Sequence, residues 1–337
     1  MSDFILKRLP LGMFWPTFDP FLFCAFHNDK YPEGDGDMGP AASLVGRMLG
    51  QDFVGMDGWR MYHGKKIPGF PAHPHRGFET VTIVNKGLVD HADSMGASGR
   101  YGEGDTQWMT AGEGIQHSEM FPLLNEEGNN PLELFQIWLN LPSKNKMVPP
   151  HFTMLWDEDT PIVKALDGNG HETSIKVVAG TLNDVAAAPC PPNSWAVESE
   201  SDSHVAIWII DLPEQGQWTL PAAVSGLNRS LYFFEGEQVE LNGVKGSINE
   251  AFVLKSDTSV VIKNLGKLAR FLMLQGRPIG EHVEQHGPFV MNTKAELQQA
   301  FNDYQMTKFG GWPWPRHDQV HDKSAERFAK YADAQVK

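Results

Sequence analysis

Short apolar runs that end at glycine, proline, asparagine or aspartate recur along most of this chain. Clear examples are FETVTIV (78–84), LELFQIWLNL (132–141), HVAIWIIDL (204–212) and ARFLMLQG (269–276). Runs of this length, spaced by turn residues, are typical of sandwiches and barrels built from antiparallel strands. The spacing therefore predicts an all-β architecture.

The runs fall into two sets, which are separated by a polar, proline-interrupted stretch, MLWDEDTPIVKALDGNGHE (154–172). A chain of 337 residues is long enough for two domains that each bury a core. We therefore expect one barrel over residues 1–165 and a second barrel over residues 166–290. Residues 291–337 are expected to form a C-terminal helix and tail.

The expected helix lies near the C-terminus. Thr293 and Glu296 have the spacing of a capping box, in which the two side chains satisfy backbone N–H groups of the first helical turn. Leu297, Phe301 and Tyr304 then follow at helical spacing. The pattern predicts a helix over about residues 294–306.

Composition restricts the classes of function. Hydrophobic residues make up 41% and charged residues 21% of the chain, and no apolar run reaches the ~20 residues of a membrane-spanning helix. The net charge of -14 disfavours direct binding to nucleic acid and is compatible with a basic protein partner. The two cysteines, Cys24 and Cys190, lack metal-binding or redox spacing. Since no secretory leader is recognisable, we expect a cytoplasmic protein that does not bind membranes.

Two pairs of residues carry the chemistry. His73 and His75 are two positions apart, and so are His117 and Glu119. Alternate residues of a strand point to the same face, so each pair delivers two side chains to one point. The strands expected between the pairs let a barrel bring both pairs together. Three neutral imidazoles and a carboxylate suit Fe(II), Mn, Ni, Cu or Zn. Surface or core histidines are the alternative interpretation of each pair alone.

Several longer segments resemble the pirin family of the cupin superfamily. They are HPHRGFETVTIV (73–84), DTQWMTAGEGIQHSEM (105–120), DPFLF (19–23), ELFQIWLNLP (133–142), KMVPPHF (146–152) and QHGPFVMNT (285–293). The resemblance implies two cupin barrels in tandem, each a double-stranded β-helix or jelly roll. It also implies one Fe(II) ion in the N-terminal barrel, held by His73, His75, His117 and Glu119. No metal is expected in the second barrel, where His204 is isolated.

Glu79 shares the parity of the first histidine pair, so strand geometry alone also permits it as the carboxylate ligand. The pirin resemblance favours Glu119 instead. Glu79 then joins Arg76 and Gln136 as candidates that orient the ligands from outside the ligand set.

The segment from Asp29 to Phe70 is long and rich in glycine and methionine, and it leads directly towards His73. Long loops beside a site are often lids, so we expect this segment to cover the entrance of the metal pocket. It follows CAFHN (24–28), where pirins usually carry an acidic residue and often a histidine. Core aromatic residues that could also wall an apolar pocket are Phe78, Trp108, Phe135 and Trp138.

The resemblance implies two functions of different classes. The first is an iron-dependent dioxygenase, similar to the quercetin 2,3-dioxygenases among pirin-like proteins. It would act with dioxygen on a small aromatic, flavonol-like or enolic substrate, and Glu119 would be both a ligand and the proton acceptor. The second is an iron-dependent, redox-sensitive regulatory or adaptor protein that binds another protein. The enzyme is the leading hypothesis.

Overall fold

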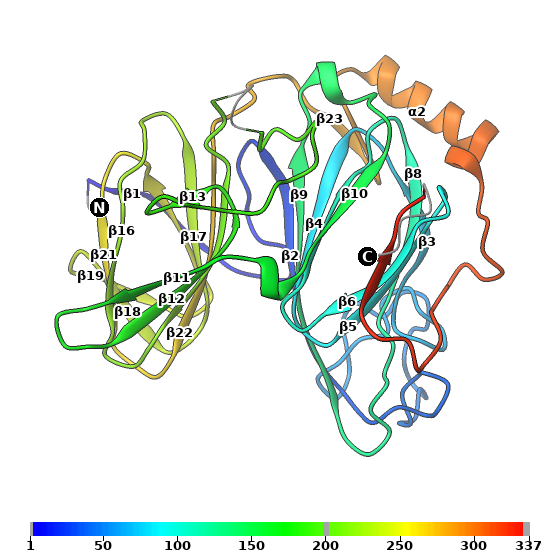
Figure 1. Cartoon of the computed structure of the whole chain (residues 1–337), viewed down its shortest axis with the longest axis horizontal. Coiled ribbons are helices and arrows are strands. Elements are labelled where there is room, and N and C mark those ends of the chain that lie inside the picture. Colours follow the sequence, from blue (N-terminus) through cyan, green and yellow to red (C-terminus); the bar gives the residue numbers. More distant parts are fainter. Residues whose placement is uncertain (1–2, 198–201, 333–337) are drawn as a thin grey trace. The chain divides into compact units, whose positions relative to one another are not determined.

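A computed structural model describes residues 3–197 and 202–332 of the chain (Figure 1). Within these residues the secondary structure is β-strand with one α-helix, α2 (Lys294–Thr307), and three short 3-10 helices. The 3-10 helices are η1 (Ser143–Asn145), η2 (Asp157–Asp159) and η3 (Lys308–Gly310). The predicted all-β class with a short C-terminal helix is confirmed. In the described part of the chain, no helix is long and apolar enough to cross a membrane.

The chain divides into two compact units, and each unit combines two segments that are distant in sequence. Phe26–Asp157 and Glu281–Lys337 form one unit, which we call the histidine unit because it contains all four candidate ligands. Met1–Ala25 and Glu158–Gly280 form the second unit. The boundaries expected at residues 165 and 290 assumed instead that each barrel is one continuous stretch.

Strand pairing explains this difference. Near the N-terminus, β1 (Ile5–Pro10) pairs antiparallel with β20 (Glu250–Lys255) and so belongs to the second unit. Near the C-terminus, β25 (Phe328–Lys330) pairs antiparallel with β6 (Ser98–Gly102) of the histidine unit. Such pairings join residues far apart in sequence, and the hydrophobic pattern of a single strand does not specify its partner.

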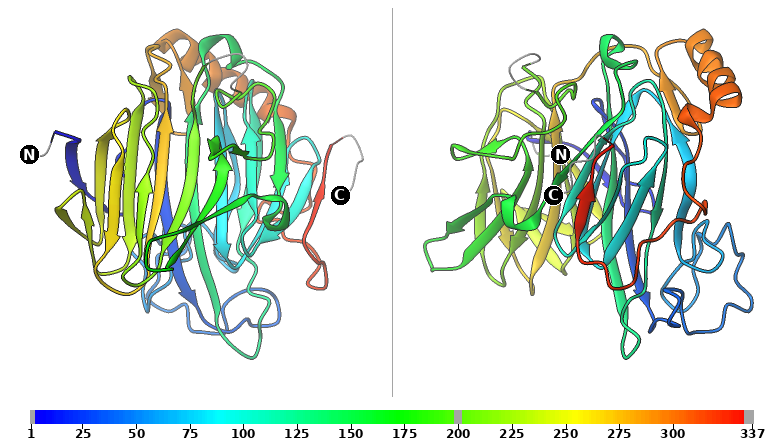
Figure 2. Two further views of the ribbon diagram at one scale, coloured as in Figure 1. Left: turned by 60° about the vertical axis from the view of Figure 1, so that its left-hand side comes forward. Right: turned by 45° about the vertical axis from the view of Figure 1, so that its right-hand side comes forward.

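Two five-stranded sheets form the histidine unit, with the orders β10-β7-β4-β9-β2 and β25-β6-β5-β8-β3. Their other strands are β2 (Phe21–Tyr31), whose part from Phe26 onwards lies in this unit, β3 (Gly69–His75), β4 (Phe78–Lys86), β5 (Leu88–Asp93), β7 (Thr106–Thr110), β8 (Ile115–Met120), β9 (Asn130–Asn140) and β10 (His151–Leu155). The sheets face each other, because the Thr82 hydroxyl of β4 lies 3.0 Å from the Glu119 carboxylate of β8. In Figure 2 the red strand β25 lies beside the cyan strands of its sheet.

The second unit contains a seven-stranded sheet, β1-β20-β17-β22-β15-β12-β11, and a four-stranded sheet, β16-β21-β18-β19. Its other strands are β11 (Ile162–Leu166), β12 (Glu172–Ala179), β13 (Thr181–Leu182), β14 (Val185–Ala186), β15 (Ala206–Leu212), β16 (Gln217–Leu220), β17 (Asn228–Glu235), β18 (Gln238–Leu241), β19 (Val244–Ser247), β21 (Val260–Asn264) and β22 (Ala269–Gly276). The core between these strands is apolar and includes Ile175, Trp208, Leu231 and Phe271.

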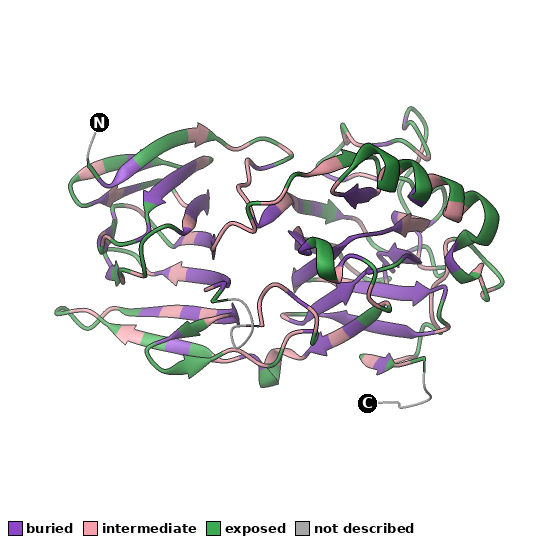
Figure 3. Cartoon of the chain, turned by 90° about the horizontal axis from the view of Figure 1, so that it is seen from above, coloured by how far each residue is buried: buried purple, intermediate pink, exposed green. Residues whose placement is uncertain are grey.

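The helix α2 lies on the surface of the histidine unit, next to the hairpin of β23 (Glu284–His286) and β24 (Phe289–Met291). Most of its turns are exposed and therefore green in Figure 3, while Ala300 is buried. As predicted, the Thr293 hydroxyl caps the helix by accepting a hydrogen bond from the Glu296 backbone N–H at 3.2 Å. Phe301 packs edge-on against Phe289 at a centroid distance of 4.8 Å, which fixes the helix to the hairpin.

Candidate metal centre

Three histidines converge between the two sheets of the histidine unit. His73 on β3 stands directly opposite His117 on β8, and His75 follows on the same face of β3. The ring centroid of His73 lies 4.5 Å from that of His117 and 4.7 Å from that of His75. Each of the three offers a ring nitrogen, and these atoms all lie within 4.8 Å of one another. That spacing lets one ion contact all three.

The chemistry of these imidazoles fits a divalent metal. Burial lowers the pKa of His73 to about 4 and holds the pKa values of His75 and His117 well below the usual range. All three rings are therefore neutral near pH 7, and a neutral ring presents a lone pair. Neither ring nitrogen of His117, which is 0% exposed, has a hydrogen-bond partner in the protein. A metal ion would satisfy a buried nitrogen of this kind.

The Glu119 carboxylate lies beside the histidines, with Oε2 3.8 Å from Nε2 of His117. The amide Nε2 of Gln136 donates to Oε2 at 2.8 Å, and the Thr82 hydroxyl lies 3.0 Å from Oε1. Thr82 also contacts Oε1 of Gln136. Burial raises the pKa of Glu119, while Thr82 and Gln136 partly oppose that shift. The carboxylate is thus held in place and is more basic than a carboxylate in water.

Of the three residues that we expected to orient the ligands, one contacts a candidate ligand in the structure through a hydrogen bond. Gln136 contacts Glu119 directly. Glu79 is buried and accepts a hydrogen bond from the Thr110 hydroxyl at 2.7 Å, on the face of β4 that points away from the histidines. Arg76 donates to Asp303 at 2.7 Å and to the Glu113 carbonyl at 2.6 Å.

The parity argument for Glu79 does not hold because the strand is interrupted. β3 ends at His75, and Gly77 has a φ of +85°, which breaks the alternation before β4 begins at Phe78. Phe78, not Glu79, consequently faces the histidines, and its ring lies 5.1 Å from that of His75.

Aromatic side chains line one side of the site. The rings of Phe78 and Trp138 lie 5.1 Å and 5.4 Å from the His75 ring, and Trp138 is partly exposed. Phe135 stacks on Phe26 at 4.7 Å. Trp108 pairs with Val81 on the opposite face of the sheet, away from the histidines. Two of the four aromatic candidates therefore lie beside a predicted ligand.

Two residues near the site were missed in the sequence. Thr82 contacts Glu119, as described above. His91 on β5 stands opposite Glu119, and its fully buried ring lies 5.6 Å from the His117 ring. His91 and Asp93 are two positions apart, as His73 and His75 are, and Asp93 stands opposite His117. That repetition is the signal that could have identified the segment.

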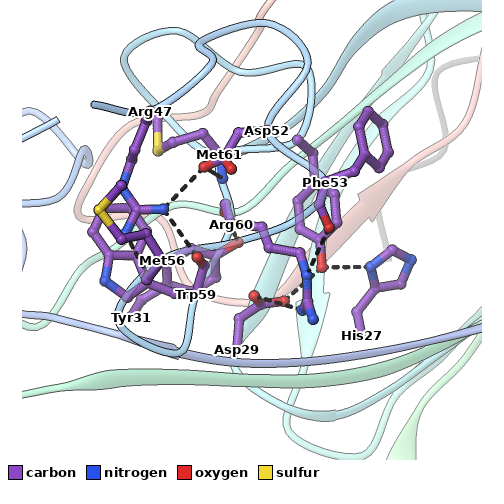
Figure 4. Close-up of polar contacts among 11 residues, drawn as sticks. His27, Asp29, Tyr31, Arg47, Asp52, Phe53, Met56, Trp59, Arg60 and Met61 are labelled. Atoms are coloured by element: carbon purple, nitrogen blue, oxygen red, sulfur yellow. Dashed lines mark hydrogen bonds and ion pairs between the residues drawn. The ribbon is translucent and has the colours of Figure 1, made fainter. Parts of the chain in front are cut away.

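Residues 29–70 are fixed by two polar clusters (Figure 4). In the first, the Tyr62 hydroxyl donates to Asp29 at 2.6 Å and accepts from Nδ1 of His27 at 2.7 Å, while Arg60 donates to Asp29 at 3.0 Å. Burial raises the pKa of Asp29 to about 6, against the opposing effects of Tyr62 and Arg60. Phe70 links this cluster to the site, since its ring lies 6.3 Å from that of His73.

The second cluster surrounds Arg47. Its guanidinium forms an ion pair with Asp52 at 2.9 Å, donates to the carbonyls of Trp59 and Met56, and lies 3.3 Å above the Trp59 ring. The segment has no strand or helix between β2, which ends at Tyr31, and β3, which begins at Gly69, and these contacts fix its conformation there. The role of the segment as a lid stays a prediction.

Within residues 3–197 and 202–332, the three histidines are the one group of at least three His, Cys, Asp or Glu residues that meets the distance requirement for a metal. In the second unit, Nε2 of His204 lies 2.6 Å from Asp202.

Comparison with known proteins identifies the family. Residues 43–139 match the Pirin family model, and residues 207–310 match the model of the Pirin C-terminal cupin domain. The chain is 38% identical to Pirin-1 of Arabidopsis thaliana over 252 residues, which cover 72% of this chain and 78% of that protein. It is 37% identical to a pirin-like protein of Caulobacter vibrioides, over 72% of this chain and 81% of that protein.

A solved structure agrees. The crystal structure of quercetin 2,3-dioxygenase from Acinetobacter baumannii superposes with a TM-score of 0.71 at 28% identity, over 91% of this chain and 98% of that one. The tandem cupin architecture is thereby confirmed. The chain belongs to the pirin family.

Proposed function

We propose that this pirin is a metal-dependent dioxygenase, with His73, His75, His117 and Glu119 as the protein ligands of one Fe(II) ion. The observation that carries the proposal is the meeting of three neutral imidazoles, of which His75 and His117 are buried, with a hydrogen-bonded carboxylate. Four protein ligands leave further positions of a six-coordinate metal for substrate and dioxygen. When bound, the ion would supply Lewis-acid polarisation and redox chemistry with dioxygen.

The substrate class is supported by the walls of the site. The partly exposed ring of Trp138 beside His75 offers a flat apolar surface against which a flavonol-like or enolic ring can pack, and the buried ring of Phe78 lies 4.3 Å from it. The similarity to a quercetin 2,3-dioxygenase supports the same class.

In this mechanism Glu119 accepts the proton of the substrate hydroxyl. Its carboxylate suits this role because it lies beside the three histidines, with Oε2 3.8 Å from Nε2 of His117. Gln136 and Thr82 keep the carboxylate in position.

An alternative is a metal-dependent regulatory protein that binds another protein, and one observation favours it. In residues 44–56 several apolar side chains point into solvent, notably Val45 at 86%, Met48 at 67% and Val54 at 92% exposure. Arg47 fixes the chain of this segment through the carbonyls of Trp59 and Met56 and through the Asp52 carboxylate. Exposed apolar groups gathered on a fixed segment are typical of a protein-binding surface.

The test is anaerobic reconstitution with Fe(II), followed by dioxygen uptake and product analysis with a panel of flavonols. We expect turnover by the wild-type protein, its loss together with the metal in His75→Ala, and little change in Glu79→Gln. Equal activity of the wild type and His75→Ala would assign the reaction to free iron and refute the proposal. Metal binding without any turnover would favour the regulatory alternative.

A further inference from the structure

A cavity of 520 Å³ lies within the histidine unit, apart from the metal centre. Its lining is formed by Asp93, Met95, Ala97, Ile115, Pro150, His151, Phe152, Thr153, Tyr331 and Ala332. None of the four candidate metal ligands lines it. The volume falls within the range of small-molecule sites, which is roughly 300–1,000 Å³.

One wall of the cavity is aromatic. Phe152 on β10 and Tyr331, which directly follows β25, stack with a centroid distance of 4.8 Å and an interplanar angle of 24°. Met95, Ala97 and Ile115 add apolar surface. A flat ring packs favourably against surfaces of this kind.

Polar groups provide hydrogen-bond acceptors at the same cavity. Oδ1 of the buried Asp93 accepts from the backbone N–H groups of Met95 and Ala97, at 2.9 Å and 3.0 Å, and Oδ2 lies 3.3 Å from Nε2 of His91, so the carboxylate is fixed in place. The Thr153 hydroxyl lies 3.3 Å from Nε2 of His151, and its oxygen retains a lone pair for a further donor. The polar lining therefore favours a ligand that donates a proton, such as a phenol.

The C-terminal segment builds the outer wall. It lies beyond both family-model matches, which end at residues 139 and 310. Arg327 donates to Asp105 at 2.6 Å, and the buried Arg100 donates to the carbonyl of Ala325 at 2.8 Å. Together with the pairing of β25 and β6, these bonds position Tyr331 beside Phe152.

Two aromatic layers separate the cavity from the metal centre. The Phe152 ring lies 5.3 Å from the ring of His91, and the His91 ring lies 5.6 Å from that of His117. A molecule in the cavity would consequently sit behind His91 and outside the reach of the ligand nitrogens.

We propose that this cavity is a second ligand site, which binds a phenolic molecule of one or two fused rings. The rings would lie along Phe152 and Tyr331, and the phenol O–H would donate to the Thr153 hydroxyl. The proposal does not depend on the dioxygenase activity, because the site includes no metal ligand and involves no reaction.

The experiment uses 2-naphthol as the probe and measures its binding to the full-length, metal-free protein by calorimetry, so that the probe cannot bind a metal. Met95→Trp fills the cavity from an exposed position, and Met306→Trp is the matched control at an exposed position of α2. Tyr331→Ala removes part of the aromatic wall. His75→Ala tests whether the probe instead uses the metal centre.

We expect binding by the wild type, at least about tenfold weaker binding by Met95→Trp and Tyr331→Ala, and unchanged binding by Met306→Trp and His75→Ala. 2-Methoxynaphthalene, which has no O–H, should bind more weakly than the probe. Absence of binding by the wild type would overturn the proposal. Equal binding by the wild type and Met95→Trp, or loss of binding in His75→Ala, would also overturn it.

Discussion

Replacing Gln136 with leucine removes the amide that donates to Oε2 of Glu119 at 2.8 Å, while the side-chain volume stays similar. Thr82 remains as a donor to the other carboxylate oxygen, so the Glu119 side chain loses one of its two hydrogen bonds and keeps the other. The variant therefore isolates the contribution of one hydrogen bond to the proposed metal site.

The magnitude follows from the charge of Glu119 in the two states. Burial raises the pKa of Glu119, so the neutral acid is more favoured in the metal-free site than it is in water, whereas a metal ligand must be ionised. A hydrogen bond to a charged group contributes about 1.5–3 kcal/mol and one between neutral groups about 0.5–1.5 kcal/mol. The difference of roughly 1–1.5 kcal/mol predicts that Gln136→Leu weakens metal binding by about tenfold.

The assay is competition for Zn(II) or Co(II) against a chromophoric chelator, which avoids the oxidation of iron. Glu79→Gln is the matched control, because Glu79 is a buried, hydrogen-bonded residue of the adjacent strand that does not face the histidines. Thermal unfolding of the metal-free proteins checks that both variants fold. Wild-type affinity in Gln136→Leu, with weakened binding in Glu79→Gln, would refute the reasoning.

Three further predictions concern the histidine unit. Glu119→Ala should sharply reduce bound metal, whereas Glu79→Gln should retain most of it; elemental analysis that gives the reverse order would identify Glu79 as the ligand. The buried Nζ of Lys146 donates to three oxygens, so Lys146→Met should lower the free energy of unfolding by about 2–4 kcal/mol, as measured by urea denaturation of the metal-free protein. Burial raises the pKa of Asp29 from its usual 3.8 to about 6, so the folded state keeps this proton after the unfolded chain has lost it. The stability of the unit should therefore fall by up to about 3 kcal/mol as pH rises from about 4 to 6, and Asp29→Asn should flatten this part of the profile; an unchanged profile would contradict the assignment.

The candidate metal centre was predictable from sequence because it depends on a local rule. Side chains two positions apart on a strand share a face, so His73 with His75 and His117 with Glu119 could be recognised as pairs without knowledge of the fold. The rule fails where the strand is interrupted. Gly77 separates β3 from β4, and for this reason Glu79 does not share the face of the histidines.

Features that depend on long-range pairing could not be obtained in this way. Thr82 and His91 lie near Glu119 because β4 faces β8 and because β5 pairs with β8, and neither relation is encoded in a short segment. The same limit explains the domain boundaries, since β1 and β25 pair with strands more than 200 positions away in sequence. The all-β class and the capped helix near residue 294 were predictable because both follow from local patterns.

The central claim is that one metal ion is held by His73, His75, His117 and Glu119. The most direct measurement is the Fe(II) content per chain after anaerobic equilibrium dialysis, for the wild type and for His117→Ala, since His117 is the fully buried member of the group. We predict one ion per chain in the wild type and almost none in a folded His117→Ala variant. An unchanged iron content in that variant would contradict the account.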